Sequence, residues 1–237
     1  MLGLTLIKGN QQVRTFMDWG LVPKTRFNVS PPEPKTLYVE ITGSDAIIDL
    51  TESLTGYVCY KMRKCEITFT IPGRRSEWSS IYSTVLNFLQ GEKLKVISDE
   101  DTDWYWVGRF QVSDWDTVQK IGEITISGDV EPYKIKVDAD DHEFVFSVEG
   151  VNGAVVQGSK KHVVPVIDYT NFSAGEGSVY LLNSGDPDDI KAALVEGENR
   201  FPEIIFGEGQ NTLYFRIDPD DMMYQATINI KYDIGSL

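Results

Sequence analysis

Residues that carry covalent or metal chemistry are scarce in this sequence. It has two cysteines and two histidines among 237 residues. Cys59 and Cys65 have no second pair and no neighbouring histidine, so they do not form a zinc motif. His142 and His162 lie in no nucleophile motif, and the sequence has neither a Walker loop nor a complete dinucleotide-binding glycine motif. We therefore expect no enzymatic activity, no cofactor and no metal site.

Long hydrophobic runs are also missing. No apolar segment approaches the roughly 20 residues that a membrane helix requires. The first eight residues lack the basic start and the small-residue cleavage site of a secretion signal. We expect no membrane partner and synthesis in a reducing cytoplasm, where Cys59 and Cys65 stay free thiols. A disulfide between them after release from the cell is the alternative.

Positive charge is in short supply and is unevenly placed. The net charge is −14, which argues against specific nucleic-acid binding by a basic patch. Residues 1–136 have 16 Lys and Arg against 18 Asp and Glu, whereas residues 137–237 have 6 against 18. This asymmetry indicates two domains with different surroundings.

What the sequence does have is a series of short β patterns and one helical pattern. Residues 65–71 alternate between apolar and polar side chains, as a half-buried strand does. Further strands are predicted at 38–41, 47–50, 57–60, 94–97, 105–110, 124–127 and 132–137. A helix is predicted after Ser76, with apolar residues from Trp78 to Leu89 at helical spacing and Gly91 just beyond its end.

The second half predicts a β-sandwich. Short strands are expected at 144–148, 162–167, 179–182, 203–206, 212–217 and 227–232, separated by turns rich in Gly and Asp. Residues 190–195 are predicted as a helical turn or a loop. An acidic stretch at 138–143 marks the boundary, which gives domains 1–137 and 138–237.

The first 36 residues read as an irregular N-terminal arm. Pro31, Pro32 and Pro34 hold the chain extended and prevent a helix. Residues 30–36 are either an arm that contacts another subunit or a solvated connector.

Several motifs, taken in order, resemble the distal tail (Dit) family of siphophages and related prophage tail components. In the first half they are Trp19-Gly20-Leu21, residues 43–51, residues 60–63, residues 67–69, the helix ending at Leu89-Gln90-Gly91, residues 105–109 and Pro132-Tyr133-Lys134. Residues 209–215 and 232–237 are similar to the ending of such proteins. Ala46 departs from the family, which more often has an Arg and a second Gly in this turn.

The resemblance implies a mainly β protein without catalysis. Its N-terminal domain would be a β-sandwich or split barrel with one helix, similar to tail-tube subunits, and its C-terminal domain a galectin-like β-sandwich. The family forms a homo-hexameric ring at the virion tail tip, between the tail-tube protein and the tail-tip hub protein. Receptor-binding proteins dock on the outer domain in some phages, and synthesis takes place in the bacterial host cytoplasm.

Two sets of site residues follow from these alternatives. Candidates for assembly contacts are Trp19, Leu21, Pro31, Pro32, Arg63 and Arg109. For Arg63 and Arg109, an ion pair between subunits and an ordinary charge at a strand edge both remain open. The alternative function is a carbohydrate-binding module, with a stacking platform made from Tyr169, Phe172, Tyr180 or Tyr214.

Overall fold

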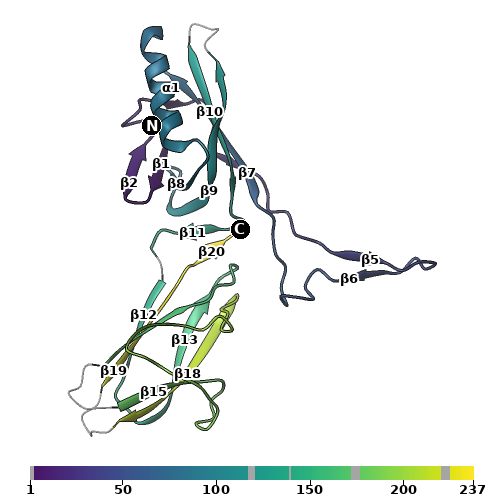
Figure 1. Cartoon of the computed structure of the whole chain (residues 1–237), viewed down its shortest axis with the longest axis vertical. Helices are drawn as coiled ribbons and strands as arrows, with labels where there is room; N and C mark the ends of the chain where they lie inside the picture. The colour runs from purple at the N-terminus through teal and green to yellow at the C-terminus, as the bar shows by residue number, and fades with distance from the viewer. Residues whose placement is uncertain (1–2, 117–120, 139, 172–176, 220–224) are drawn as a thin grey trace. The chain divides into compact units, whose positions relative to one another are not determined.

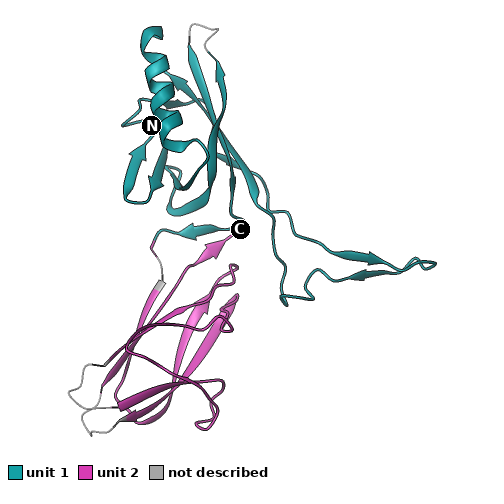
Figure 2. Cartoon of the chain, viewed as in Figure 1, with its two compact units in different colours: residues 1–137, 237 teal, residues 138–236 magenta. Residues whose placement is uncertain are grey.

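The computed structural model describes residues 3–116, 121–138, 140–171, 177–219 and 225–237. Phe172, one of the glycan candidates, lies outside them. The chain divides into two compact units, residues 1–137 with Leu237 and residues 138–236 (Figure 2). The predicted mainly β class is confirmed, because one helix accompanies the many antiparallel strands of the described residues.

The first unit is built on one antiparallel sheet with the strand order β2-β1-β8-β9-β10-β7-β3 (Figure 1). Two further strands pair with members of this sheet outside that order: β4 pairs with β7, and β11 pairs with β9. The strands are β1 (Leu4–Lys8), β2 (Gln11–Arg14), β3 (Val22–Pro23), β4 (Asn28–Val29), β7 (Arg63–Ile71), β8 (Glu92–Ser98), β9 (Asp101–Asp116), β10 (Gly122–Val130) and β11 (Lys134–Lys136). The alternation predicted for 65–71 is confirmed, since Cys65, Ile67 and Phe69 all point into the core.

The helix α1 (Arg75–Leu89) packs its apolar side against this sheet. Trp78, Val85 and Leu89 are buried, as the helical spacing predicts. The helix starts two residues earlier than predicted, because the Glu77 carboxylate accepts the backbone N–H of Arg74 at 3.3 Å and caps the first turn there. Gly91 has φ +73°, the left-handed conformation expected just past a helix end.

The N-terminal arm predicted for residues 1–36 is wrong for the strands Leu4–Lys8 and Gln11–Arg14 and for the buried Leu21. Leu4–Lys8 is an interior strand between β2 and β8, and Leu4, Leu6 and Leu21 are core residues. The alternation of Leu4 and Leu6 with polar or half-buried neighbours supplies one buried face, which commits the segment to the sheet. The projecting element is instead a hairpin of β5 (Tyr38–Glu40) and β6 (Ile47–Asp49).

The second unit consists of two four-stranded sheets packed face to face. Their orders are β12-β19-β14-β17 and β13-β18-β15-β16. The strands are β12 (Asp140–Phe146), β13 (Gly150–Gly158), β14 (Val166–Asn171), β15 (Gly177–Leu182), β16 (Ile190–Ala193), β17 (Gly197–Arg200), β18 (Gly209–Pro219) and β19 (Ala226–Tyr232), with β20 (Gly235–Ser236) near the C-terminus. Phe215, Ile228 and Ile230 are fully buried between the sheets. The helical turn or loop predicted for 190–195 is wrong, because Ile190–Ala193 pairs with β15.

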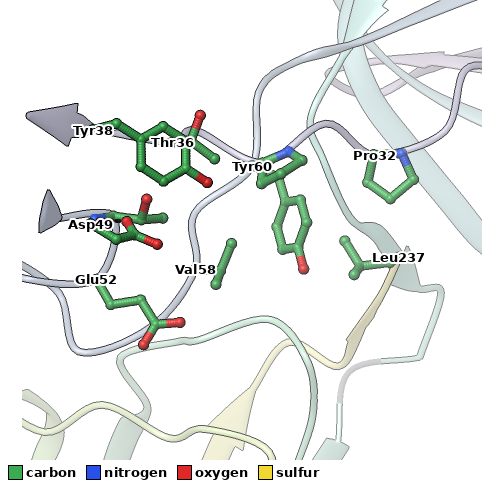
Figure 3. A pocket seen from close by; sticks show the side chains of 10 residues that line it. Pro32, Thr36, Tyr38, Asp49, Glu52, Val58, Tyr60 and Leu237 are labelled. Atoms are coloured by element: carbon green, nitrogen blue, oxygen red, sulfur yellow. Dashed lines mark hydrogen bonds between the residues drawn. The ribbon is translucent and has the colours of Figure 1, made fainter. Parts of the chain in front are cut away.

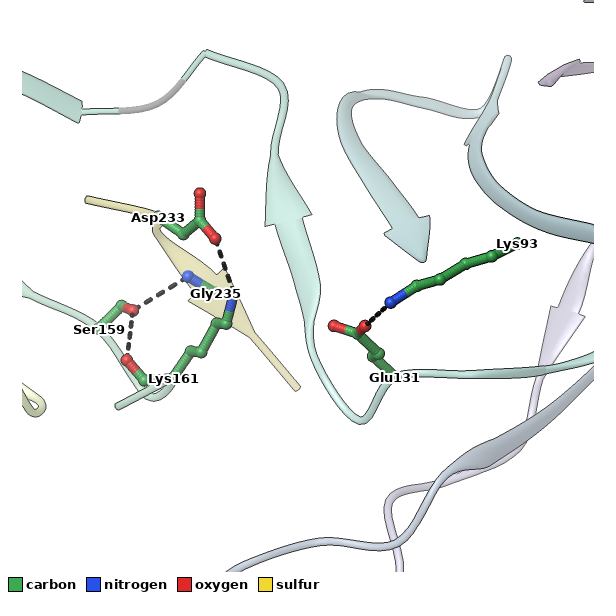
Figure 4. A network of polar contacts seen from close by, with 6 residues as sticks. All are labelled: Lys93, Glu131, Ser159, Lys161, Asp233 and Gly235. Carbon is green, nitrogen blue, oxygen red and sulfur yellow. Dashed lines mark hydrogen bonds and ion pairs between the residues drawn. The ribbon is translucent and has the colours of Figure 1, made fainter. Parts of the chain in front are cut away.

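Each unit has an ion pair that ties distant parts of its chain together (Figure 4). In the first unit, Lys93 Nζ lies 3.0 Å from a Glu131 carboxylate oxygen and joins β8 to the end of β10. In the second unit, Lys161 pairs with Asp233 at 2.8 Å, and the Gly235 N–H donates to Ser159 Oγ at 3.0 Å. These contacts are partly exposed, so each contributes at most about 1 kcal/mol to stability.

Candidate assembly surface

The hairpin β5–β6 exposes apolar side chains on both of its faces. Tyr38 lies opposite Asp49, Val39 opposite Ile48 and Glu40 opposite Ile47, so neighbouring residues alternate between the faces. Every residue of both strands is exposed, and Tyr38 has 57% of its surface accessible. A two-stranded hairpin is only marginally stable by itself in water, and contiguous exposed apolar residues mark interaction sites. The hairpin is therefore the strongest candidate for an assembly contact in the described chain.

The two chain segments at the base of the hairpin are hydrogen-bonded to each other. The backbone N–H of Lys35 donates to the Cys59 carbonyl and that of Lys61 to the Glu33 carbonyl, both at 2.8 Å. Tyr60 packs edge to face on Tyr133, with ring centroids 6.0 Å apart. Residues 33–61 thus form one continuous ribbon whose base is held by the first unit and whose end carries β5 and β6 (Figure 1).

Arg63, predicted as an assembly residue, serves to hold the proline-rich segment at the base of the ribbon. Its Nε donates to the Ser30 carbonyl and its Nη1 to the Pro132 carbonyl at 3.2 Å. The guanidinium lies over Trp106, 4.7 Å from the ring centroid, and its burial lowers the pKa of Arg63. The guanidinium of Arg63 thus has all three of these partners within its own unit.

The other assembly candidates are divided between core and surface. Leu21 is fully buried, and Trp19 is half-buried and packs edge to face on Phe88. Arg109 is exposed, although its Nη1 donates to the Gly91 carbonyl at 2.9 Å, next to the helix end. Pro31 is exposed and Pro32 is half-buried. Of the six, Pro31 and Arg109 are the exposed residues that can contact a second molecule.

A pocket of about 720 Å³ lies at the base of the hairpin and includes Pro32 (Figure 3). Its apolar wall is formed by Pro32, Pro34, Tyr38, Val58, Tyr60 and Leu237. The carboxylates of Asp49 and Glu52 lie on one side of it, and Tyr60 and Leu237 on the other. Hydrogen bonds from the Thr51 hydroxyl and from the Thr51 N–H, the latter 2.9 Å long, lower the pKa of Asp49. The pocket therefore combines apolar walls with negative charge.

The glycan candidates of the second unit do not lie on one common face of the sandwich. Tyr169 is 5% exposed and belongs to the core, so its ring is not available for stacking on a ligand. Tyr180 and Tyr214 lie on the outer face of β13-β18-β15-β16. The Arg216 guanidinium covers Tyr180 at 4.8 Å from the ring centroid and pairs with Asp218 at 2.8 Å.

Tyr214 is half-buried, as Tyr180 is. It lies opposite Gly153 in the neighbouring strand and close to Gly185. A Cβ built at these glycines would lie 3.8 Å and 3.7 Å from the ring, and neither residue has a side chain to occupy that space. The ring of Tyr214 therefore lies beside two glycine backbones, with no side chain at either position.

The described residues give little support for a metal site or a reactive thiol. Among the described residues no group of three or more His, Cys, Asp and Glu side chains could hold a metal ion. Cys59 and Cys65 are free, and burial, with the nearby negative charge of Asp129 as a smaller cause, raises the pKa of Cys65 to about 12. The described part of the chain also has no helix of the length and apolar character needed to cross a membrane.

Sequence reasoning missed the hairpin as a site although it predicted strands at 38–41 and 47–50. The turn residue Gly43, with φ +82°, fits the short connection between them. The pattern of apolar residues gave no indication that these strands leave the core, because periodicity reports a strand and not what covers it. Four exposed aliphatic residues within positions 39–48, Val39, Ile41, Ile47 and Ile48, become a signal only once the fold is known.

Comparison with known proteins gives a likeness at the level of the fold. No protein-family model matches the sequence, and no curated protein matches it. The fold is similar to a crystal structure of the Dit (gp 19.1) protein of SPP1, described as a paradigm of the hub adsorption apparatus in phages that infect Gram-positive bacteria. The TM-score is 0.62 at 11% sequence identity, over 98% of this chain and 99% of that one. At this identity the likeness establishes a Dit-like fold.

Proposed function

We propose that this protein is a structural, non-enzymatic subunit of a bacteriophage tail tip. Six copies form a ring that joins the tail-tube protein to the tail-tip hub protein in the virion. The hairpin β5–β6 carries the proposal, because it exposes apolar residues that its own chain does not cover. The Dit-like fold of the whole chain supports it.

In this proposal the two domains have separate tasks. Residues 1–137 form the ring, with the hairpin reaching the neighbouring subunit, and residues 138–237 serve as a docking platform for a receptor-binding protein. A ring with head-to-tail contacts uses two different patches of each subunit. The acidic surplus of the second half suits solubility or the attraction of a basic partner.

The test is the solution mass of the full chain by light scattering after size exclusion, over a series of protein concentrations. Six chains of 26.7 kDa give about 160 kDa for a closed ring. We expect this mass for the natural chain and a monomer when both Ile47 and Ile48 are replaced by Ser. A chain that stays monomeric at every concentration would contradict the ring, and a hexamer that tolerates both serines would contradict the role of the hairpin.

A carbohydrate-binding module is the second candidate, and Tyr214 is the observation in its favour. Its ring lies between two glycines on an exposed sheet face, where a sugar could stack. Titration of a bacterial cell-wall glycan should then change the chemical shifts of Tyr214, and Tyr214→Ala should abolish binding. Tyr169→Phe serves as a control that leaves binding intact, since that ring is in the core.

A further inference from the structure

The pocket at the base of the hairpin has the chemistry of a receptor for arginine. Aromatic and proline rings form one part of its wall, and the carboxylates of Asp49 and Glu52 form another. Glu52 has no ion-pair partner among the described residues, and the hydrogen bonds that Asp49 accepts come from the neutral Thr51. No Lys or Arg lines the pocket. Guanidinium groups bind carboxylates through charge-assisted hydrogen bonds and stack on aromatic rings.

Within the described part of the first unit, one pair of adjacent arginines has no ion-pair partner. Arg74 and Arg75 are adjacent, exposed and form no salt bridge with any described residue. They stand at the start of α1, where the helix dipole disfavours positive charge. The fold of the subunit gains nothing from two cations in this position.

Apolar surface surrounds this arginine pair. Pro72 is exposed just before it, and Ile121, 52% exposed, lies beside it because Gly122 is paired with Ile71. Together, Pro72, Arg74, Arg75 and Ile121 form a protruding patch that we call the arginine turn. The arginine turn matches the pocket in both charge and apolar character.

Most other cations of the first unit already have partners. Lysines paired with carboxylates at 2.7–3.1 Å are Lys8, Lys24, Lys64, Lys93 and Lys134. Arg26 pairs with Glu100, and Arg63 and Arg109 donate to backbone carbonyls. The arginine turn is therefore the place where two neighbouring cations await an anionic partner.

We infer that the pocket of one subunit receives the arginine turn of the next subunit in the ring. Asp49 and Glu52 pair with the guanidinium groups of Arg74 and Arg75, while Tyr38 and Tyr60 contact the apolar part of the turn. The two patches differ and occur once on each chain, as head-to-tail assembly requires. This inference rests on the proposed ring and names the contact that closes it.

The experiment is a charge-reversal cycle on the full chain, with assembly measured by sedimentation velocity over a concentration series. One variant has Asp49→Lys and Glu52→Lys, a second has Arg74→Glu and Arg75→Glu, and a third combines all four changes. We expect each double variant to weaken assembly at least about tenfold, since close interfacial charge pairs couple this strongly. The combined variant should recover most of the loss, because the charges are then exchanged across the same contact.

Controls separate this contact from a general effect of charge. Glu149→Lys with Glu196→Lys makes the same change in net charge at exposed positions of the second unit and should leave assembly unchanged. Circular dichroism should show a folded chain for every variant, as every substituted side chain is exposed.

The outcomes distinguish the contact from the ring. A natural chain that never assembles overturns the ring and this contact with it. A natural chain that forms a hexamer, with a combined variant no better than the weaker double variant, overturns the contact alone. Normal assembly of the Asp49→Lys, Glu52→Lys variant also overturns it.

Discussion

The hairpin of the first unit and the sandwich of the second place isoleucines in opposite surroundings. Ile47 and Ile48 in β6 are 62% and 45% exposed, whereas Ile228 and Ile230 in β19 are fully buried. Both segments are strands with β-branched residues, but β19 lies between β12 and β14 in a sheet whose inner face is covered by a second sheet. The hairpin pairs only with itself. The sandwich therefore covers these apolar residues within one chain, whereas the hairpin leaves its own exposed.

The largest expected change in stability comes from removing a buried aromatic ring from the sandwich. Phe215 is fully buried between the two sheets, so Phe215→Ala should lower the free energy of unfolding by about 3–5 kcal/mol. Urea denaturation followed by circular dichroism measures the change. Val155→Ala, at an exposed position of the neighbouring strand, is the control and should stay within about 0.5 kcal/mol. A loss below about 1 kcal/mol for Phe215→Ala would contradict a tightly packed sandwich.

A smaller effect tests the sheet from which the hairpin projects. Burial raises the pKa of Cys65 from 9.0 to about 12, so above pH 9 the unfolded chain loses the thiol proton while the folded chain keeps it. This contribution to stability should therefore fall as pH rises between about 9 and 12, by about 1.4 kcal/mol per pH unit. Urea denaturation at several pH values measures the slope.

Two cysteine variants isolate the Cys65 contribution. Cys65→Ala should lose this part of the slope, and Cys59→Ala should keep it, because Cys59 is only half-buried. Equal slopes for the natural chain and for Cys65→Ala would show that Cys65 is not buried in solution.

The smallest expected effect on unfolding belongs to the hairpin itself. Replacing Ile47 and Ile48 by Ser should change the free energy of unfolding of the monomer by about 0.5 kcal/mol or less, since both side chains are exposed. The same change at Ile228 should destabilise the second unit strongly, because it puts a hydroxyl in a dry core. Chemical denaturation at a concentration too low for assembly measures both. A large loss at Ile47 and Ile48 would mean that the hairpin folds back onto its own chain.

Local patterns predicted much of this fold because they depend on neighbouring residues alone. The alternation at 65–71 and the spacing from Trp78 to Leu89 specify a strand and a helix whatever surrounds them. The segment 190–195 shows no clear alternation, because its edge strand β16 is only four residues long. The prolines of residues 30–36 predict an extended arm, whereas the alternating leucines of β1 place the start of the chain in the sheet.

The sequence by itself determined the mainly β class, the one helix, the shortage of catalytic and metal-binding side chains, and the acidic second half. These depend on composition and on short periodicities. Only the tertiary structure decided that Leu21 and Tyr169 are buried, that Arg63 is held within its own unit, and that Ile47 and Ile48 are uncovered. Burial and partnership depend on which distant segments meet, and the periodicity of a single strand contains no information about that.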